Sequence, residues 1–268
     1  MAEAFPTVGV DVSRPNAARM YDYMLGGSAN FAADREAADA MLAAAGSSPA
    51  PARTNRSFLR RAVRLMLDNG IDQFLDLGSG IPTVGNVHEI AQAANPAARV
   101  VYVDNEPVAV HHAHQLLAGN DNAVMVEADL RDVDSVLIHP ETARLLDFRR
   151  PVGVLMVAIF HFIPDADDPG RIVARYRAAM AGGGYLAMSH FIENGEDRAR
   201  RGAEAYRQTS TPVVGRTRAE FAGLFQGLPL VEPGVVFTPE WRPDGSDPPL
   251  ESAAQSRILA AVAEVPAG

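Results

Sequence analysis

The spacing of apolar residues changes near residue 70, which indicates two kinds of structure along the chain. Before that point, apolar side chains recur at helical intervals, and glycine or proline marks the breaks. Three helices are expected there, one from Pro15 to the Gly26-Gly27 pair, one over 31–45 and one over 50–69. After it, short apolar runs alternate with longer amphipathic segments, so strands and helices should alternate.

Continuous apolar runs between helical segments are typical of a mostly parallel sheet covered on both faces. The pattern therefore predicts an α/β fold with a seven-stranded, mostly parallel sheet. We expect an N-terminal helical cap over residues 1–48 and a core over residues 49–268. The expected strands are 73–77, 99–103, 123–127, 152–159, 184–191, 230–237 and 257–264, and the expected helices are 83–95, 107–118, 132–146, 169–181 and one that begins at a Thr217/Glu220 capping box.

The first expected strand ends in a glycine loop that a ligand could approach closely. The sequence QFLDLGSGIPTVG places Asp76 inside the strand and Gly78 and Gly80 directly after it. Glycine has no Cβ, so its backbone tolerates positive φ and close contact with a ligand. In open parallel sheets, ligands bind beyond the carboxyl ends of the strands. A tight turn alone would explain two glycines equally well, so the residues that follow the neighbouring strands are needed to distinguish a ligand-binding loop from a simple turn.

Acidic residues follow the next two expected strands. Asp104 ends RVVYVD and lies 24 residues beyond Gly80, close to the roughly 20 expected for an acid that binds ribose hydroxyls. A carboxylate can accept hydrogen bonds from two neighbouring hydroxyls. Asp129 follows AVMVEA and could accept a hydrogen bond from an adenine amine. Each acid alone could be a helix N-cap, but together they predict a nucleoside-binding edge.

These motifs, with VAIFHFIPD at 157–165, resemble the cofactor motifs of Rossmann-like S-adenosylmethionine-dependent methyltransferases. The similarity covers nearly the whole chain. ARMYDYMLGGSANFAADREAA, NRSFLRRAV, FLDLGSGIPTVGNVHEIAQ, VYVDNEPV and PEWRPDG resemble an actinobacterial methyltransferase family formerly described as domain of unknown function 574. The resemblance implies a Rossmann-like fold and S-adenosylmethionine as the cofactor. It implies no particular methyl acceptor.

Cofactor-binding residues follow from this resemblance, position by position. Asp76 is expected at the methionine ammonium and Asp104 at the ribose. The other implied contacts are Gly78, Ser79 and Gly80 along the methionine portion, Asn105, Asp129 and Leu130 around the adenine, and Ile159 and Phe160 at the end of the fourth strand.

Basic and N-terminal residues extend the expected site. Arg53 and Arg56 lie about one helical turn apart, and a guanidinium can bind the methionine carboxylate through two hydrogen bonds. We select Arg56, with a solvated surface arginine as the alternative. Tyr23, Asn30 and Phe31 are expected in a lid over the sulfonium or the acceptor, unless the two aromatic rings only pack the N-terminal helices.

His161 is the candidate catalytic residue. It follows the fourth strand, where an acceptor would approach the methyl group, and a neutral imidazole could deprotonate a hydroxyl or an amine. A structural histidine is the alternative, and His190 is a weaker candidate. No metal site is predicted, because His111 and His114 share a helix face without an acidic partner.

Two loop residues argue against a dinucleotide. Pro82 stands where many nucleotide-binding loops carry glycine, and Thr83 occupies the last position of G-x-G-x-x-G. That glycine permits close helix–strand packing beside a pyrophosphate, and S-adenosylmethionine has no phosphate. Thr83 is instead expected to be the N-cap of the next helix.

Composition narrows the possible partners. The chain has 268 residues and a formal net charge of -9, which weighs against nonspecific binding to nucleic acid or an anionic membrane. It contains no cysteine, which excludes disulfides, thiolate metal sites and cysteine nucleophiles. Apolar stretches fall short of the roughly 18 residues that span a bilayer, and the N-terminus does not resemble a signal peptide, so we expect a cytoplasmic protein.

The favoured function is therefore an S-adenosylmethionine-dependent methyltransferase acting on a small molecule. The alternative is a noncatalytic protein that binds S-adenosylmethionine or S-adenosylhomocysteine and regulates a partner. An NAD-dependent oxidoreductase is a third interpretation, which Thr83 disfavours. The sequence identifies neither the acceptor nor the oligomeric state.

Overall fold

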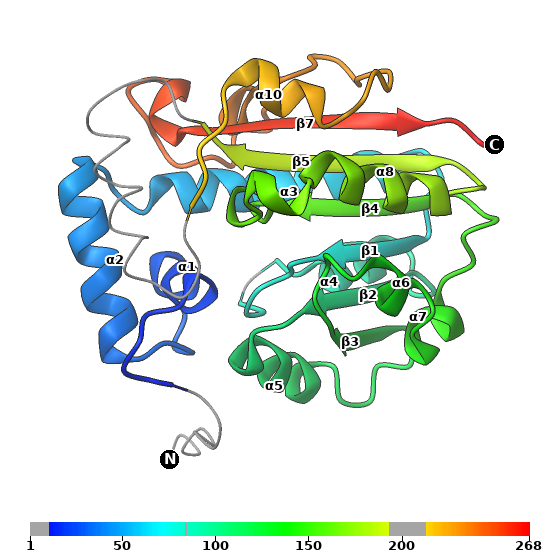
Figure 1. Ribbon diagram of the computed structural model, residues 1–268, viewed down its shortest axis with the longest axis horizontal. Helices are drawn as coiled ribbons and strands as arrows, with labels where there is room; N and C mark the ends of the chain where they lie inside the picture. The colour runs from blue at the N-terminus through cyan, green and yellow to red at the C-terminus, as the bar shows by residue number, and fades with distance from the viewer. Residues whose placement is uncertain (1–10, 84, 193–212) are drawn as a thin grey trace.

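The computed structural model describes residues 11–83, 85–192 and 213–268. Seven strands of these segments form one sheet (Figure 1). The strands are β1 Gln73–Leu77, β2 Arg99–Asp104, β3 Ala123–Glu127, β4 Val152–Val157, β5 Gly184–Phe191, β6 Val236–Phe237 and β7 Ile258–Val265. Their order is β3-β2-β1-β4-β5-β7-β6, with β1 to β5 parallel and β7 antiparallel to both of its neighbours. The prediction of a seven-stranded, mostly parallel sheet is confirmed.

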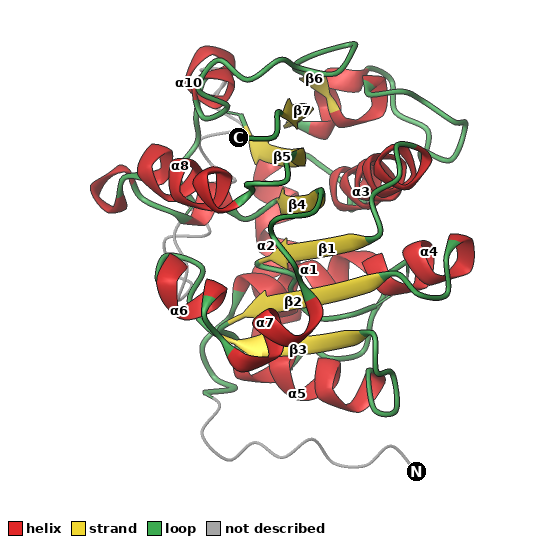
Figure 2. Ribbon diagram, turned by 90° about the vertical axis from the view of Figure 1, so that its right-hand side faces the viewer, coloured by secondary structure: helices red, strands yellow, loops and turns green. Residues whose placement is uncertain are grey.

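Helices cover both faces of this sheet (Figure 2). They are α1 Ala17–Leu25, α2 Ala32–Ala45, α3 Ala50–Asp68, α4 Val87–Ala94, α5 Pro107–Leu116, α6 Val133–Leu137, α7 Pro140–Leu145, α8 Pro169–Ala179 and α10 Arg218–Gly223. In β2, Val100 and Tyr102 pack with α3, α4 and α5, whereas Val101 and Val103 pack with α6, α7, α8 and α10. Successive strand side chains point to opposite faces, so two apolar layers explain why the strands are apolar throughout.

Two predicted elements differ from those in the structure, a strand that is shorter and a helix that is divided in two. The strand expected over 152–159 stops at Val157, because Ala158 has a left-handed φ of 57° that ends the ladder. The helix expected over 132–146 is two short helices, α6 and α7. Pro140 starts the second of them, since proline lacks the N–H that a continuing helix would need.

The N-cap of α4 was assigned wrongly to Thr83. The helix begins at Val87, and the Glu89 side chain accepts a hydrogen bond from the Asn86 backbone N–H at 2.8 Å. Thr83 Oγ1 is buried, with no hydrogen-bond partner in the described part of the chain. The loop after β1 therefore runs several residues further before the helix starts.

Near the C-terminus, the Thr217/Glu220 capping box is confirmed at the start of α10. The strand expected over 230–237 is reduced to the two residues of β6. Leu230 makes only an isolated bridge to Ala263 in β7.

Helices α1 and α2 lie beyond the carboxyl ends of the parallel strands (Figure 1). The buried Arg19 holds them there, because its guanidinium forms salt bridges with Asp34 at 2.9 Å and with Glu106 at 3.1 Å. These contacts join α1 to α2 and to the turn after β2. The cap expected over residues 1–48 remains a prediction; the position of α1 and α2 agrees with it, and residues 1–10 lie outside the described residues. In the described part of the chain, no helix is long and apolar enough to cross a membrane.

Candidate active site

A cavity of about 250 Å³ opens where β1, β2 and β4 end. Its walls come from α1, α2, the first turns of α3, the loop after β1, residues 104–106, residues 157–159, residues 161–162 and the segment that leads into β7. The cavity thus lies between the sheet and the N-terminal helices, at the edge where α/β folds bind ligands.

The glycine loop forms one wall, and its conformation requires glycine. Gly78 and Gly80 have φ of 68° and 66°, a region that other residues rarely adopt. A Cβ on Gly78 would lie 2.3 Å from Cγ1 of Ile159, so this loop and the end of β4 are in close contact. Ser79 and Ile159 also line the cavity, as predicted for cofactor contacts.

Asp104 is held rigidly at the end of β2. One carboxylate oxygen accepts the Gly80 backbone N–H at 2.7 Å, and the other accepts the Glu106 N–H at 2.9 Å. Each oxygen keeps further acceptor capacity, because a carboxylate has about four lone-pair sites. Burial raises the pKa of Asp104, and the backbone N–H donors oppose that shift. Asp104 and the neighbouring Asn105 both line the cavity.

Asp76 and Arg56 place opposite charges on the same wall without pairing directly. Asp76 is 6% exposed, and its side chain has no hydrogen bond within the described residues. Burial raises the pKa of Asp76 to about 7, while Arg56 lowers it and Asp104 raises it. The Nε atom of Arg56 is buried and has no partner in the described segments. Both groups are therefore available to a ligand that carries both charges.

Three residues expected at the cofactor do not line the cavity. Arg131 donates to the Asp129 carboxylate at 2.9 Å and also to Asp167, so Asp129 is occupied by its near neighbour. Leu130 and Phe160 are buried in the apolar layer on the α8 side of the sheet. This geometry gives no support to their assignment as cofactor contacts.

The lid residues chosen from the sequence also lie outside the cavity wall. The Tyr23 hydroxyl bonds to Asp39 at 3.1 Å, and Asn30 donates to Asp22 at 2.8 Å. Phe31 packs beneath the guanidinium of Arg19, which lies 5.4 Å from the ring centroid. These contacts lie within α1, α2 and the turn between them, and none of the three residues lines the cavity.

Other side chains of α1 and α2 face the cavity instead, and the sequence analysis missed them. Tyr21 and Met24 line it from α1, and Met41 and Leu42 line it from α2. Tyr21 and Met24 are three residues apart and share a helix face, which Tyr23 does not. Helical periodicity was the signal that could have found them.

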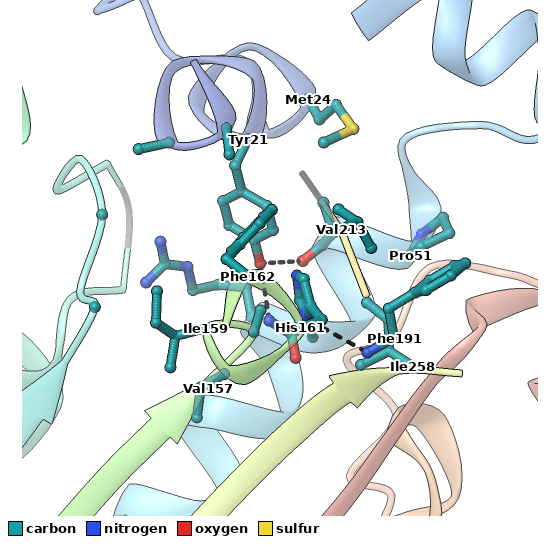
Figure 3. Close-up of a pocket in the computed structure, with 18 of the residues that line it drawn as sticks. Tyr21, Met24, Pro51, Val157, Ile159, His161, Phe162, Phe191, Val213 and Ile258 are labelled. Carbon is teal, nitrogen blue, oxygen red and sulfur yellow. Dashed lines mark hydrogen bonds between the residues drawn. The ribbon is translucent and has the colours of Figure 1, made fainter. Parts of the chain in front are cut away.

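A chain of hydrogen bonds fixes Tyr21 against the sheet. Its hydroxyl donates to the Ala52 carbonyl and accepts from the Asn55 amide, both at 3.0 Å (Figure 3). Asn55 in turn accepts from Ser189 Oγ at 2.6 Å, and Ser189 accepts from the Ala158 N–H at 2.9 Å. The left-handed turn after β4 is thereby linked to α3 and α1.

His161 lines the cavity beside Tyr21 and Phe191 (Figure 3). Its Nδ1 accepts the Phe191 backbone N–H at 3.3 Å. A neutral imidazole that accepts through Nδ1 carries its proton on Nε2, so Nε2 is a donor. Burial lowers the pKa of His161 well below its ordinary value, and His190 and Arg216 lower it further. This geometry does not support the assignment of His161 as a general base, because the accepting nitrogen is already occupied.

His190 lies behind His161 and does not line the cavity. It is 1% exposed, and its Nε2 is 2.8 Å from Nη1 of Arg216. The same guanidinium donates to the carbonyl oxygens of Phe160 and Ile163, which shapes the turn after β4. Burial lowers the pKa of His190 to about 4, so this pair supports the turn with a neutral imidazole.

Comparisons with known proteins identify the family and the fold of the chain. The model of a family described as S-adenosyl methyltransferase matches residues 4–266. A crystal structure from Thermobifida fusca, described as that of a candidate methyltransferase, is 40% identical, with a TM-score of 0.90 over 98% of this chain and 99% of that chain. A DUF574 family protein from Streptomyces avermitilis is also 40% identical, with a TM-score of 0.90 over 96% of this chain and 99% of that chain.

More distant structures share the fold alone. An O-methyltransferase family protein from Burkholderia thailandensis is 12% identical, with a TM-score of 0.52 over 78% of this chain and 55% of that chain. None of the curated proteins compared with the chain matches it. The family match spans almost the full sequence. The chain therefore belongs to the S-adenosyl methyltransferase family, and it is a methyltransferase that uses S-adenosylmethionine.

Proposed function

We propose that this protein transfers the methyl group of S-adenosylmethionine to a small molecule that enters the cavity. The observation that carries this proposal is the unpaired acid and cation, Asp76 and Arg56, on one wall. The methionine end of the cofactor is a zwitterion. Its ammonium suits the Asp76 carboxylate, and its carboxylate suits the guanidinium of Arg56.

The remaining cofactor contacts follow from the same wall. Asp104 is rigid and retains acceptor sites for two ribose hydroxyls. Gly78 and Gly80 leave room for the methionine chain, and Asn105 lies next to Asp104 on the cavity wall. These residues fit a nucleoside joined to an amino acid.

The bound cofactor supplies a methyl group already activated by its sulfonium. The chain's task is therefore to orient an acceptor in line with the methyl–sulfur bond and to exclude water. Helices α1 and α2 would exclude water, because they close the cavity from the side opposite the sheet.

The wall away from Asp76 and Asp104 is mainly apolar. Met24, Phe162, Phe191, Val213 and Ile258 contribute to it (Figure 3). This space beyond the cofactor contacts favours an enzyme with a small-molecule acceptor over a noncatalytic cofactor-binding protein.

Two measurements test the proposal. Calorimetry should show binding of S-adenosylmethionine and S-adenosylhomocysteine and no comparable binding of NAD. Incubation with methyl-labelled cofactor and a cell extract should then transfer label to the small-molecule fraction. Binding of NAD alone would refute the cofactor assignment, and label found only in protein or nucleic acid would refute the acceptor assignment.

A further inference from the structure

The cavity contains no free base among the described residues. Its ionisable side chains other than His161 and Arg257 all have assigned roles. Glu106 is paired with Arg19 at 3.1 Å. The Tyr21 hydroxyl already donates to the Ala52 carbonyl, and burial raises its pKa. The remaining ionisable groups on the wall are Arg56, Asp76 and Asp104, which the proposed function assigns to the cofactor.

His161 presents a donor to the cavity. Its Nδ1 is occupied by the Phe191 N–H, and Nε2 has no hydrogen-bond partner among the described residues. A neutral Nε2–H can bind an atom with a lone pair, but it cannot remove a proton from an acceptor. Among the residues that the structure describes, an acceptor that must lose a proton before attack therefore finds no group to take it.

Arg257 brings an unpaired positive charge to the same corner. It lines the cavity, and no acidic residue in the described segments forms a salt bridge with it. Its guanidinium makes one hydrogen bond in those segments, to the Ala45 carbonyl at 3.2 Å, which leaves further N–H donors for a ligand. The Arg257 carbonyl accepts the Ile192 N–H at 3.0 Å, so Arg257 and His161 are both anchored on adjacent residues at the end of β5.

We propose that the methyl acceptor is an apolar molecule with a carboxylate group, and that Arg257 selects it by pairing with that negative charge. The inference rests on the proposed function and names its substrate class. The apolar wall would hold the body of the molecule, and His161 Nε2–H and Arg257 would hold the carboxylate.

Methyl transfer to a carboxylate needs no base. A lone pair of one carboxylate oxygen forms a bond to the methyl carbon while the carbon–sulfur bond breaks and its electron pair stays on sulfur. The products are a methyl ester and S-adenosylhomocysteine, and no proton moves. A negative acceptor and a positive sulfonium attract each other strongly in a site shielded from water.

A matched pair of probes tests the inference on the full-length protein. 2-Naphthoate and 2-naphthamide have nearly the same shape, and only the first carries a charge. Each is titrated into protein saturated with S-adenosylhomocysteine, whose own binding is measured first. The variants are Arg257→Gln and, as a control that removes the same charge from an exposed helix position, Arg171→Gln.

We expect 2-naphthoate to bind at least about tenfold more tightly than 2-naphthamide, because a charge-assisted hydrogen bond is stronger than a neutral one. Arg257→Gln should abolish that preference, and Arg171→Gln should retain it. Equal binding of the two probes, binding of neither, or a preference that survives in Arg257→Gln would overturn the acceptor class alone. Failure of S-adenosylhomocysteine to bind in the first titration would overturn the proposed function, and the acceptor class with it.

Discussion

Asp76 should make cofactor binding depend on pH in a defined direction. Its pKa is raised to about 7, mainly by burial; Arg56 opposes this increase and Asp104 adds to it. The ligand ammonium binds the ionised carboxylate, so below pH 7 the carboxyl must lose a proton before binding. Each pH unit in that range should weaken the apparent affinity by up to about tenfold, because proton loss is linked to binding. The affinity should therefore rise with pH and level off above about 7.

Calorimetric titration of S-adenosylhomocysteine between about pH 5.5 and 7.5 measures this effect. With a pKa of about 7, the ionised fraction of Asp76 rises roughly 20- to 30-fold over that range, and the affinity should rise with it. Asp76→Asn should bind weakly at both pH values. Asp129→Asn is the control, since Asp129 lies outside the cavity wall, and it should keep the wild-type dependence. A wild-type affinity that does not change with pH would refute the reasoning.

The same residue should lower the stability of the ligand-free protein above neutral pH. The pKa of Asp76 rises from 3.8 to about 7 on folding. The loss of folding stability caused by this carboxyl group is therefore absent below about pH 4 and complete above about pH 7. A shift of about three units corresponds to up to roughly 4 kcal/mol. Asp76→Asn should therefore melt at a higher temperature than the wild type at pH 8 and at a similar temperature at pH 4. Equal melting temperatures at pH 8 would contradict the buried charge.

Three further substitutions test the wall of the cavity. Asp104→Ala should weaken S-adenosylhomocysteine binding by roughly 2–3 kcal/mol in calorimetry, because hydrogen bonds to a charged group are lost; an unchanged dissociation constant in a folded variant would make Asp104 structural only. Gly78→Ala should lower both stability and cofactor affinity more than Gly80→Ala, since both have positive φ but only a Cβ on Gly78 would meet Ile159, at 2.3 Å; equal effects in thermal melting and calorimetry would count against this contact. His161→Gln keeps a donor, so its initial rate on an identified acceptor should stay within about tenfold of the wild type; a loss of about 10²–10⁴-fold would instead indicate a general base.

The part of the candidate site that follows from the predicted strands depends on strand topology. Once β1 and β2 are recognised as adjacent parallel strands, the loop at Gly78–Gly80 and Asp104 must lie at the same edge. The hydrogen bond from Gly80 N–H to Asp104 joins them in the structure. The apolar runs in the sequence were enough to predict β1 and β2, because both faces of these two strands are buried.

The hydrogen bonds that hold Tyr21 in place join segments that are far apart in the sequence. Asn55 bonds to Tyr21 across 34 positions and to Ser189 across 134 positions. No local pattern indicates such pairs. Tyr23 lies nearer than Tyr21 to the Gly26-Gly27 break, but it is Tyr21 that shares a helix face with Met24 and lines the cavity.

The position of Asp129 outside the cavity wall has a local cause. The residue does follow β3 as expected, but Arg131 lies two positions away and takes both carboxylate oxygens. The end of β3 fixes the position of the Asp129 backbone, and the hydrogen bonds from Arg131 fix the direction of its side chain. Such hydrogen bonds cannot be read from a pattern of apolar residues.

A crystal structure of the complex with S-adenosylhomocysteine tests the central claim most directly. The account predicts that the ligand carboxylate contacts Arg56, its ammonium contacts Asp76 and its ribose hydroxyls contact Asp104, with the sulfur facing the apolar wall near Phe162 and His161. A ligand that binds outside this cavity, or one whose ribose lies at Arg56 and whose amino acid end lies away from Asp76, would contradict it.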